Sequence, residues 1–273
     1  MIYLLKIEWL KIKKYTAFIV MSIFFVVGVV ATNYIVYSVN KNIVSTVGPG
    51  NILSFTPYNF ANTWQTTSYA TGFILLIPSL LLIMLFTNEY TFKTHRQNII
   101  DGLSRRQFIS VKMMMAVIFA AVATVLVFIT ALLFGFASGS DFSLSGIEFV
   151  GFFFLKALSY NMIGLLISVL IKRTGFATGV FFLYLGGENF IAKLLDIWSI
   201  KIKSTYGNDL GSMGDYLPMN AADGLITFPK NPITNLSRTI FPTDYTWLIL
   251  FLALAYLLLF YWWSRRKFIT TDL

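Results

Sequence analysis

Residues 88–113, NEYTFKTHRQNIIDGLSRRQFISVKM, separate two long apolar runs and decide how the rest of the chain is read. The stretch holds five basic and two acidic residues. Within it, Ser104 can cap a helix, and Gln107 three residues later can reach back to complete a capping box. We therefore predict that a helix begins near Arg105 and continues into the following apolar run.

The polar part of this stretch, residues 88–112, is named the central loop. Its residues 91–100 mix apolar with basic side chains and predict a short surface helix that contacts a partner. Glu89 ends the preceding apolar run, where a carboxylate opposes the helix dipole, so we expect compensation from Arg105 or Arg106. His95 is predicted to be a solvated contact residue, because a sole histidine outside any HExxH pattern does not indicate a metal site.

Composition places the chain in a membrane. Hydrophobic residues make up 57% of the 273 positions and charged residues 12%, with a mean hydropathy of +0.72, whereas soluble domains have about 25% charged residues. The absence of cysteine excludes disulfides and cysteine-metal chemistry. We therefore expect a single all-α integral membrane domain.

Six apolar runs have lengths that suit bilayer crossing, which takes about 17–25 residues. They predict spans at residues 15–38, 70–87, 113–136, 149–171, 175–191 and 247–263. Pro78 predicts a kink in the second span. Residues 1–14 place apolar side chains at helical spacing among lysines, which predicts an amphipathic helix in the membrane interface and not a cleaved signal.

Basic residues are unequally distributed over the predicted loops. If the N-terminus is cytoplasmic, that side holds fourteen of the 21 lysines and arginines but only four of the 12 acidic residues. The positive-inside rule therefore predicts that both termini and the central loop are cytoplasmic. The same rule, with attraction to anionic headgroups of the lipid bilayer, accounts for the pI of about 9.6, so nucleic acid is excluded as a partner.

Residues 192–245 are predicted to form a long extracytoplasmic loop. Residues 190–203 alternate apolar and charged side chains and predict a re-entrant or interfacial helix. The remainder is rich in Gly, Pro, Asn and Asp, and is read either as an extracytoplasmic cap or as a passive exposed loop.

Two ionisable residues lie inside predicted spans. Lys156 is seven residues into the fourth span, about 10 Å deep, so its ammonium group can reach the outer headgroups. The alternative is a residue lining a membrane path, or an ion pair with Glu188 near the outer end of the fifth span, because charges inside a membrane are commonly functional.

The central loop also carries a family resemblance. The turn Asn88-Glu89-Tyr90 is followed by a short helix, Gly102, the pair Ser104-Arg105 and Lys112. This order resembles the permease subunits of type-two ABC transporters, and the six-span layout extends the likeness over the whole chain. Many members of that family have a glycine where Lys93 stands.

The resemblance implies that the short helix is a coupling helix that docks on a separate ABC ATPase subunit. It implies a second permease, identical or related, around one path in the cell inner membrane, mostly for export, and short external helices that close the outer end. The residues expected to couple to the ATPase are Glu89, Phe92, Lys93, His95, Arg96, Ile99, Arg105 and Arg106.

No pattern in the chain predicts catalysis. A Gly-Lys dipeptide is absent, so there is no Walker A loop, and no GxSxG elbow is present. We expect no cofactor, no metal and no enzymatic activity. The predicted function is a permease subunit for ATP-driven export of a hydrophobic or amphipathic substrate. A non-transporting membrane sensor or assembly scaffold and a secondary transporter are the alternatives, although the spans show no clear inverted repeat.

Overall fold

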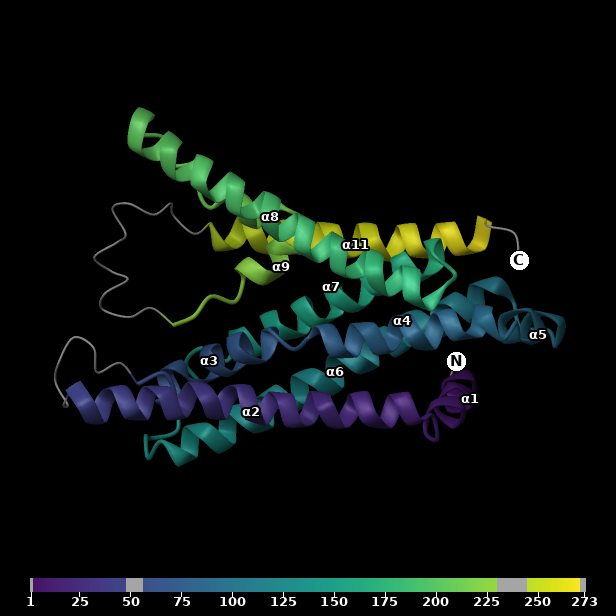
Figure 1. The fold of residues 1–273 in the computed structure, drawn as a ribbon, viewed down its shortest axis with the longest axis horizontal. Coiled ribbons are helices and arrows are strands. Elements are labelled where there is room, and N and C mark those ends of the chain that lie inside the picture. The colour runs from purple at the N-terminus through teal and green to yellow at the C-terminus, as the bar shows by residue number, and fades with distance from the viewer. Residues whose placement is uncertain (1, 48–55, 230–244, 271–273) are drawn as a thin grey trace.

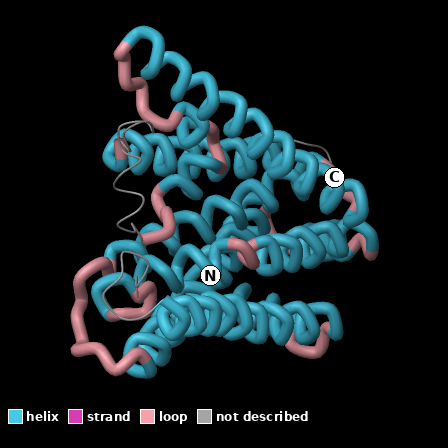
Figure 2. Tube along the Cα trace, turned by 60° about the vertical axis from the view of Figure 1, so that its left-hand side comes forward, coloured by secondary structure: helices cyan, strands magenta, loops and turns pink. Residues whose placement is uncertain are grey.

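The protein is a bundle of long α-helices in the computed structural model, which describes residues 2–47, 56–229 and 245–270 (Figure 1). No strand occurs in these ranges (Figure 2). The helices are α1 (Ile2–Ile12), α2 (Thr16–Val47), α3 (Phe60–Gly72), α4 (Leu76–Thr91), α5 (Thr94–Ile100), α6 (Arg105–Ala137), α7 (Glu148–Leu170), α8 (Thr174–Tyr206), the 3-10 helix η1 (Met213–Tyr216), α9 (Asn220–Gly224) and α11 (Thr246–Thr270).

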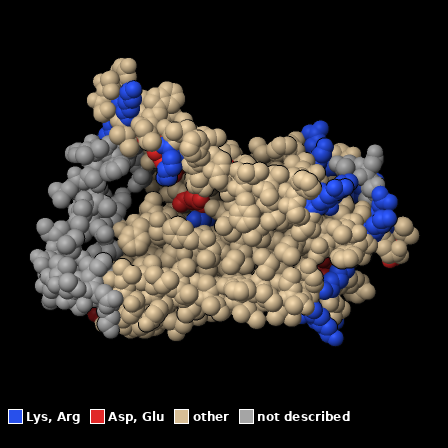
Figure 3. Space-filling view, in the orientation of Figure 1, with Lys and Arg blue, Asp and Glu red and all other residues tan. Residues whose placement is uncertain are grey.

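The two ends of the bundle differ in charge. The N-terminus, the C-terminus and the short helices α1 and α5 lie at the same end, and α9 lies toward the other (Figure 1). Lysine and arginine side chains gather mainly at the end with α5 and the termini, whereas the middle of the visible face is uncharged apart from one patch over α9 (Figure 3). An uncharged band between charged ends is the surface that a bilayer requires.

Helix α7 lies at the centre of the bundle. In its most apolar stretch of 18 residues, 83% of the residues are buried, whereas in the corresponding stretches of α2 and α11 only 17% are buried. The core around α7 is made of packed aliphatic and aromatic side chains from α4, α6, α8 and α11. The apolar side chains of α2 and α11 therefore face outward, where hydrocarbon can solvate them.

By length and composition, four helices in the described ranges can cross a membrane: α2, α6, α7 and α11. The pair α3 and α4, bent by 45°, is a fifth candidate if it counts as one span. The all-helical prediction is confirmed, whereas a total of six spans is not, because the predicted fifth span, residues 175–191, is not among these candidates. Its segment lies in α8, which is long enough but carries Glu188 and further charged residues along its second half.

The bend between α3 and α4 differs from the kink predicted at Pro78. Helix α3 begins at Phe60, ten residues before the predicted start of the span at residue 70. The helical structure is interrupted between Gly72 and Leu76. Pro78 itself lies in the first turn of α4, where the missing N–H costs nothing. Because a proline ring clashes with the carbonyl four residues earlier, which belongs to Ile74, the break comes one turn upstream of the proline.

Helix α8 corrects the prediction of a separate re-entrant helix over residues 190–203. The predicted fifth span and that segment form one continuous helix of 33 residues. No proline interrupts it, and it ends only at Gly207, whose φ of 72° is the left-handed conformation that terminates helices. The helices η1 and α9 then follow within the predicted long loop.

Candidate functional site

The central loop begins helix α6 as its residues predict. The Ser104 hydroxyl accepts a hydrogen bond from the Gln107 backbone N–H at 3.2 Å. The Gln107 side-chain oxygen accepts one from the Ser104 backbone N–H at 3.0 Å. The predicted capping box is therefore confirmed, and α6 starts at Arg105.

Lys93 forms the turn between α4 and α5. Its φ of 57° and ψ of 14° lie in the left-handed region, and it is the one non-glycine residue with a positive φ in the described ranges. For a residue with a Cβ this conformation costs about 1–2 kcal/mol. The strain at Lys93 gives a physical reason for a glycine at this point of the loop.

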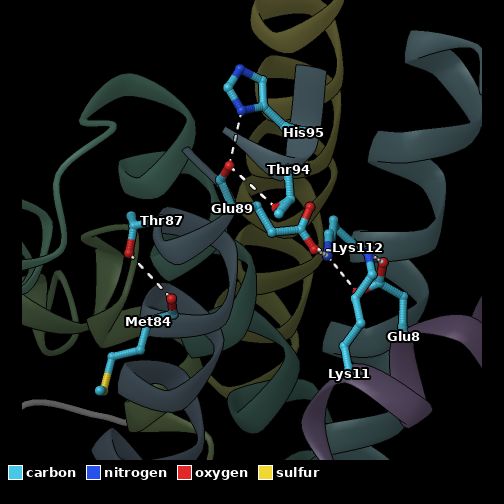
Figure 4. Close-up of polar contacts among 8 residues, drawn as sticks. All are labelled: Glu8, Lys11, Met84, Thr87, Glu89, Thr94, His95 and Lys112. Atoms are coloured by element: carbon cyan, nitrogen blue, oxygen red, sulfur yellow. Dashed lines mark hydrogen bonds and ion pairs between the residues drawn. The ribbon is translucent and has the colours of Figure 1, made fainter. Parts of the chain in front are cut away.

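Four charged side chains meet where α1, α4 and α6 converge (Figure 4). The Lys112 Nζ of α6 lies 2.5 Å from Glu8 Oε2 and 2.6 Å from Glu89 Oε1. The Lys11 Nζ lies 2.9 Å from Glu8 Oε1 and 3.3 Å from Glu89 Oε1. Glu8 and Glu89 are each 7% exposed and Lys112 is 2% exposed. We name these four residues the ion cluster. Lys11 lies at its exposed edge, and the formal charges of the four sum to zero, which offsets the cost of burying the other three.

The predicted partners of Glu89 are wrong. Arg105 instead donates a hydrogen bond from Nη1 to the backbone oxygen of Ile269, at 3.2 Å, in the last turn of α11, and Arg106 is exposed. Lys112 lies two helical turns beyond Arg105, about 10 Å along α6. At that depth it is level with the end of α4, whereas Arg105 is level with the end of α11.

His95 is also placed differently from the prediction of a solvated contact residue. It is 3% exposed, with its ring 4.3 Å from that of Tyr90. Its Nδ1 lies 3.0 Å from the backbone oxygen of Glu89, and the Thr94 hydroxyl donates to the same oxygen at 3.4 Å. That carbonyl belongs to the last turn of α4, where no intrahelical donor remains. Glu89 therefore contacts α5 through its backbone oxygen, and it contacts the other residues of the ion cluster through its side chain.

The outer face of this region remains open to solvent. Phe92 is 72% exposed and Ile100 is 77% exposed, so both apolar side chains are accessible to a partner. The predicted contact residues that also lie on this surface are Lys93, Arg96 and Arg106, and Ile99 is half-buried. Of the eight predicted contact residues, Glu89 and His95 are thus internal, and their contacts are with the protein itself.

Burial and charge act in opposite directions on the two α1 members of the ion cluster. Burial favours the neutral form of Glu8, but the charges of Lys112 and Lys11 outweigh it, and the pKa of Glu8 is lowered. Burial likewise disfavours charged Lys11, but Glu89 and Glu8 outweigh it, and the pKa of Lys11 is raised. Both groups are therefore charged near neutral pH.

At the opposite end, Lys156 and Glu188 do not pair with each other. Lys156 is 8% exposed, and its Nζ lies 3.1 Å from Asp223 Oδ1 of α9. The Tyr160 hydroxyl donates to the other Asp223 oxygen at 3.0 Å. Glu188 accepts a hydrogen bond from the Asn220 backbone N–H at 2.9 Å. Both residues hold α9 against the bundle, so their partners lie in the loop after α8 and not in each other's helices.

Sequence reasoning missed Glu8 and Lys11, and it recorded Lys112 only as a match to the family pattern. The signal for Lys112 was its depth in an apolar helix, because a charge inside a span requires a partner. Glu8 is the only acidic residue among the lysines of α1, a weaker signal. Within the described part of the chain, no cluster of three His, Cys, Asp or Glu side chains could hold a metal ion.

Comparison with known proteins identifies the family. A family model described as ABC-2 family transporter protein matches residues 4–186, two-thirds of the chain. The match includes α1 to α7 and the first part of α8, and so the whole ion cluster. A search of curated proteins found no match. The chain therefore belongs to the ABC-2 transporter family, as one of its multi-pass membrane permease subunits.

Proposed function

We propose that the chain forms half of a membrane path for ATP-driven export of a hydrophobic or amphipathic substrate. A separate ABC ATPase subunit supplies the hydrolysis. The working assembly contains two permeases, identical or related, and two ATPase subunits in the cell inner membrane. Membership of the ABC-2 family supports the division of labour between permease and ATPase. The apolar character of the helices suits the substrate class.

Six spans and cytoplasmic termini are part of the same proposal. Helix α8 supplies the fifth of these spans along the chain, which its length of 33 residues supports. Lysines and arginines gather at the end of the bundle with α5 and both termini (Figure 3). By the positive-inside rule, that end is cytoplasmic.

The observation that carries the proposal is that Glu89 links α5 to the other three residues of the ion cluster. An ATPase that grips the exposed Phe92 and Ile100 would move α5, and the contacts of His95 and Thr94 with the Glu89 backbone would pass that movement to α4. The side chain of Glu89 would carry it on to α6 and α1, because separating a buried charge from its partner costs about 3–5 kcal/mol. The ion cluster therefore makes three helices respond together.

The decisive experiment removes the two exposed apolar side chains on which the ATPase is proposed to dock. A tagged chain carrying Phe92→Ala and Ile100→Ala is purified from its native membrane in mild detergent, and the bound proteins are identified by mass spectrometry. We expect the unaltered chain to retain an ABC ATPase subunit and the double variant to lose most of it, with unchanged yield and helix content.

A matched control replaces two equally apolar surface residues, Phe142 and Leu144, by alanine in the loop between α6 and α7. These residues are 54% and 56% exposed, at the other end of the bundle. The control variant should retain the ATPase. Equal retention in both variants would remove α5 from the docking surface, and a purified chain that never holds an ATPase would favour the scaffold alternative.

A further inference from the structure

An apolar groove opens on the side of the bundle between α1, α2, α4 and α6. Its volume is about 310 Å³, and its lining is almost entirely hydrocarbon, with Glu8 as the one ionisable residue. Phe25, Leu81 and Ala123 form part of the buried floor. At the mouth, the lining residues Trp9, Val26, Ile118 and Val122 are exposed. We name this feature the α1 groove.

Water is a poor occupant of this groove. Cavities lined by aliphatic and aromatic side chains stay dry, because a buried water needs two or more polar partners. The mouth lies on α2 and α6, two helices that are long and apolar enough to cross a membrane and whose surfaces are mostly unburied. The groove is therefore open toward the hydrocarbon of the bilayer.

Charged residues next to the groove indicate which class of lipid occupies it. Lys13 and Lys14 follow α1 directly, in the turn that leads to α2, and both are exposed. Neither has an acidic partner among the described residues. Exposed lysines at the end of an interfacial helix attract the phosphate groups of anionic lipids. The groove and the two lysines together match a lipid with one acyl tail and an anionic headgroup within reach.

We propose that the α1 groove is a binding site for an anionic phospholipid, with one acyl chain in the groove and the headgroup at Lys13 and Lys14. A second copy of the chain fits less well, because the groove lining offers no exposed acidic residue that could pair with Lys13 and Lys14 of that copy. Glu8 belongs both to the groove lining and to the ion cluster. The bound lipid thus supports the position of α1 beside the coupling helix.

The experiment uses the full chain in proteoliposomes with phosphatidylglycerol that carries a diazirine on its acyl chain. After irradiation, the labelled peptides are mapped by mass spectrometry. We expect labels in α1, α2 and α6 around the groove. Phosphatidylcholine with the same diazirine should label these peptides roughly thirtyfold less, the difference that two lysine contacts support.

Two variants and their controls locate the site. Val122→Trp fills the mouth and should lower labelling at least fivefold, whereas Val125→Trp, on the same helix and equally exposed but outside the groove, should not. Replacing Lys13 and Lys14 by glutamine should abolish the preference for phosphatidylglycerol, and Lys201→Gln on α8 should leave it unchanged.

Several results would overturn the proposal. Equal labelling of the two tryptophan variants would show that the groove does not hold the chain. Equal labelling by both lipids in the unaltered protein would remove the headgroup assignment. Loss of label on dimerisation, with protein cross-links between two copies at α2 and α6, would identify the groove as an interface. If Val122→Trp fails to fold, the labelled positions in the unaltered protein decide alone.

Discussion

Removing the central cation of the ion cluster tests how α1, α4 and α6 are held together. Lys112→Met keeps the length and apolar stem of the side chain but leaves two buried carboxylates with only Lys11 to compensate them. The cluster then carries a net negative charge, since the four groups sum to zero before the change. Because removal of one partner from a buried ion pair costs about 3–5 kcal/mol, we expect a loss of stability of that size.

A second change should restore much of this loss. In the double variant Glu89→Gln with Lys112→Met, the cluster is neutral again, and the Glu8–Lys11 pair at 2.9 Å is retained. The double variant should therefore lose less than half of what Lys112→Met loses. The exposed Lys6→Met, on α1 but outside the cluster, serves as the control and should be nearly neutral.

The assay is thermal unfolding in detergent, followed by the fraction of protein that remains monodisperse. At about 2–4 °C per kcal/mol for a domain of this size, Lys112→Met should lower the midpoint by roughly 6 °C or more. The reasoning would be refuted if Lys112→Met behaved like Lys6→Met, or if the double variant were less stable than the single one.

Three further outcomes are expected. Lys93→Gly should raise the free energy of unfolding by about 1 kcal/mol, because it relieves the left-handed backbone, whereas Lys93→Ala should give no such gain in the same unfolding assay. Ser104→Ala should cost about 1 kcal/mol through loss of the helix cap, and an equal cost for Ser110→Ala would contradict this reason. The depressed pKa of Glu8 means that its contribution is present above the ordinary value of 4.5 and is lost as pH falls below it. The raised pKa of Lys11 means that its contribution is present below 10.5 and is lost as pH rises further. Glu8→Gln should flatten the acid side of a stability–pH profile, and a profile unchanged by Glu8→Gln would contradict that assignment.

Local sequence patterns predicted those structural features that depend only on residues close together in the sequence, such as helix starts and apolar helices. The cap at Ser104 and the helix after it follow from four consecutive positions, and the apolar runs follow from the needs of the bilayer. The continuity of α8 also has a signal in the sequence, since no proline occurs between its ends, but the change from apolar to mixed side chains near residue 191 predicts two separate segments.

Pairings between distant residues could not be predicted in the same way. Glu8 and Lys112 are 104 positions apart, and Lys156 and Asp223 belong to different parts of the chain. Which charges meet depends on how far each helix is shifted along its neighbours, and one sequence contains no direct signal for that shift. The sequence therefore predicts Arg105 or Arg106, at the start of the next helix, as the partner of Glu89, whereas the packing of the helices brings Lys112 to it from two turns deeper in α6.

Helix α8 gives the molecule a rigid rod between its two ends. At one end, the Thr174 hydroxyl is 2.8 Å from that of Thr87, less than one turn from Glu89. Toward the other end, Glu188 and Ser199 hold the segment that contains η1 and α9. A continuous helix of 33 residues is about 50 Å long, so a tilt of about 10° at Thr174 displaces its far tip by about 9 Å. A displacement of atomic size beside α5 is thereby enlarged to the width of a whole helix at the opposite surface.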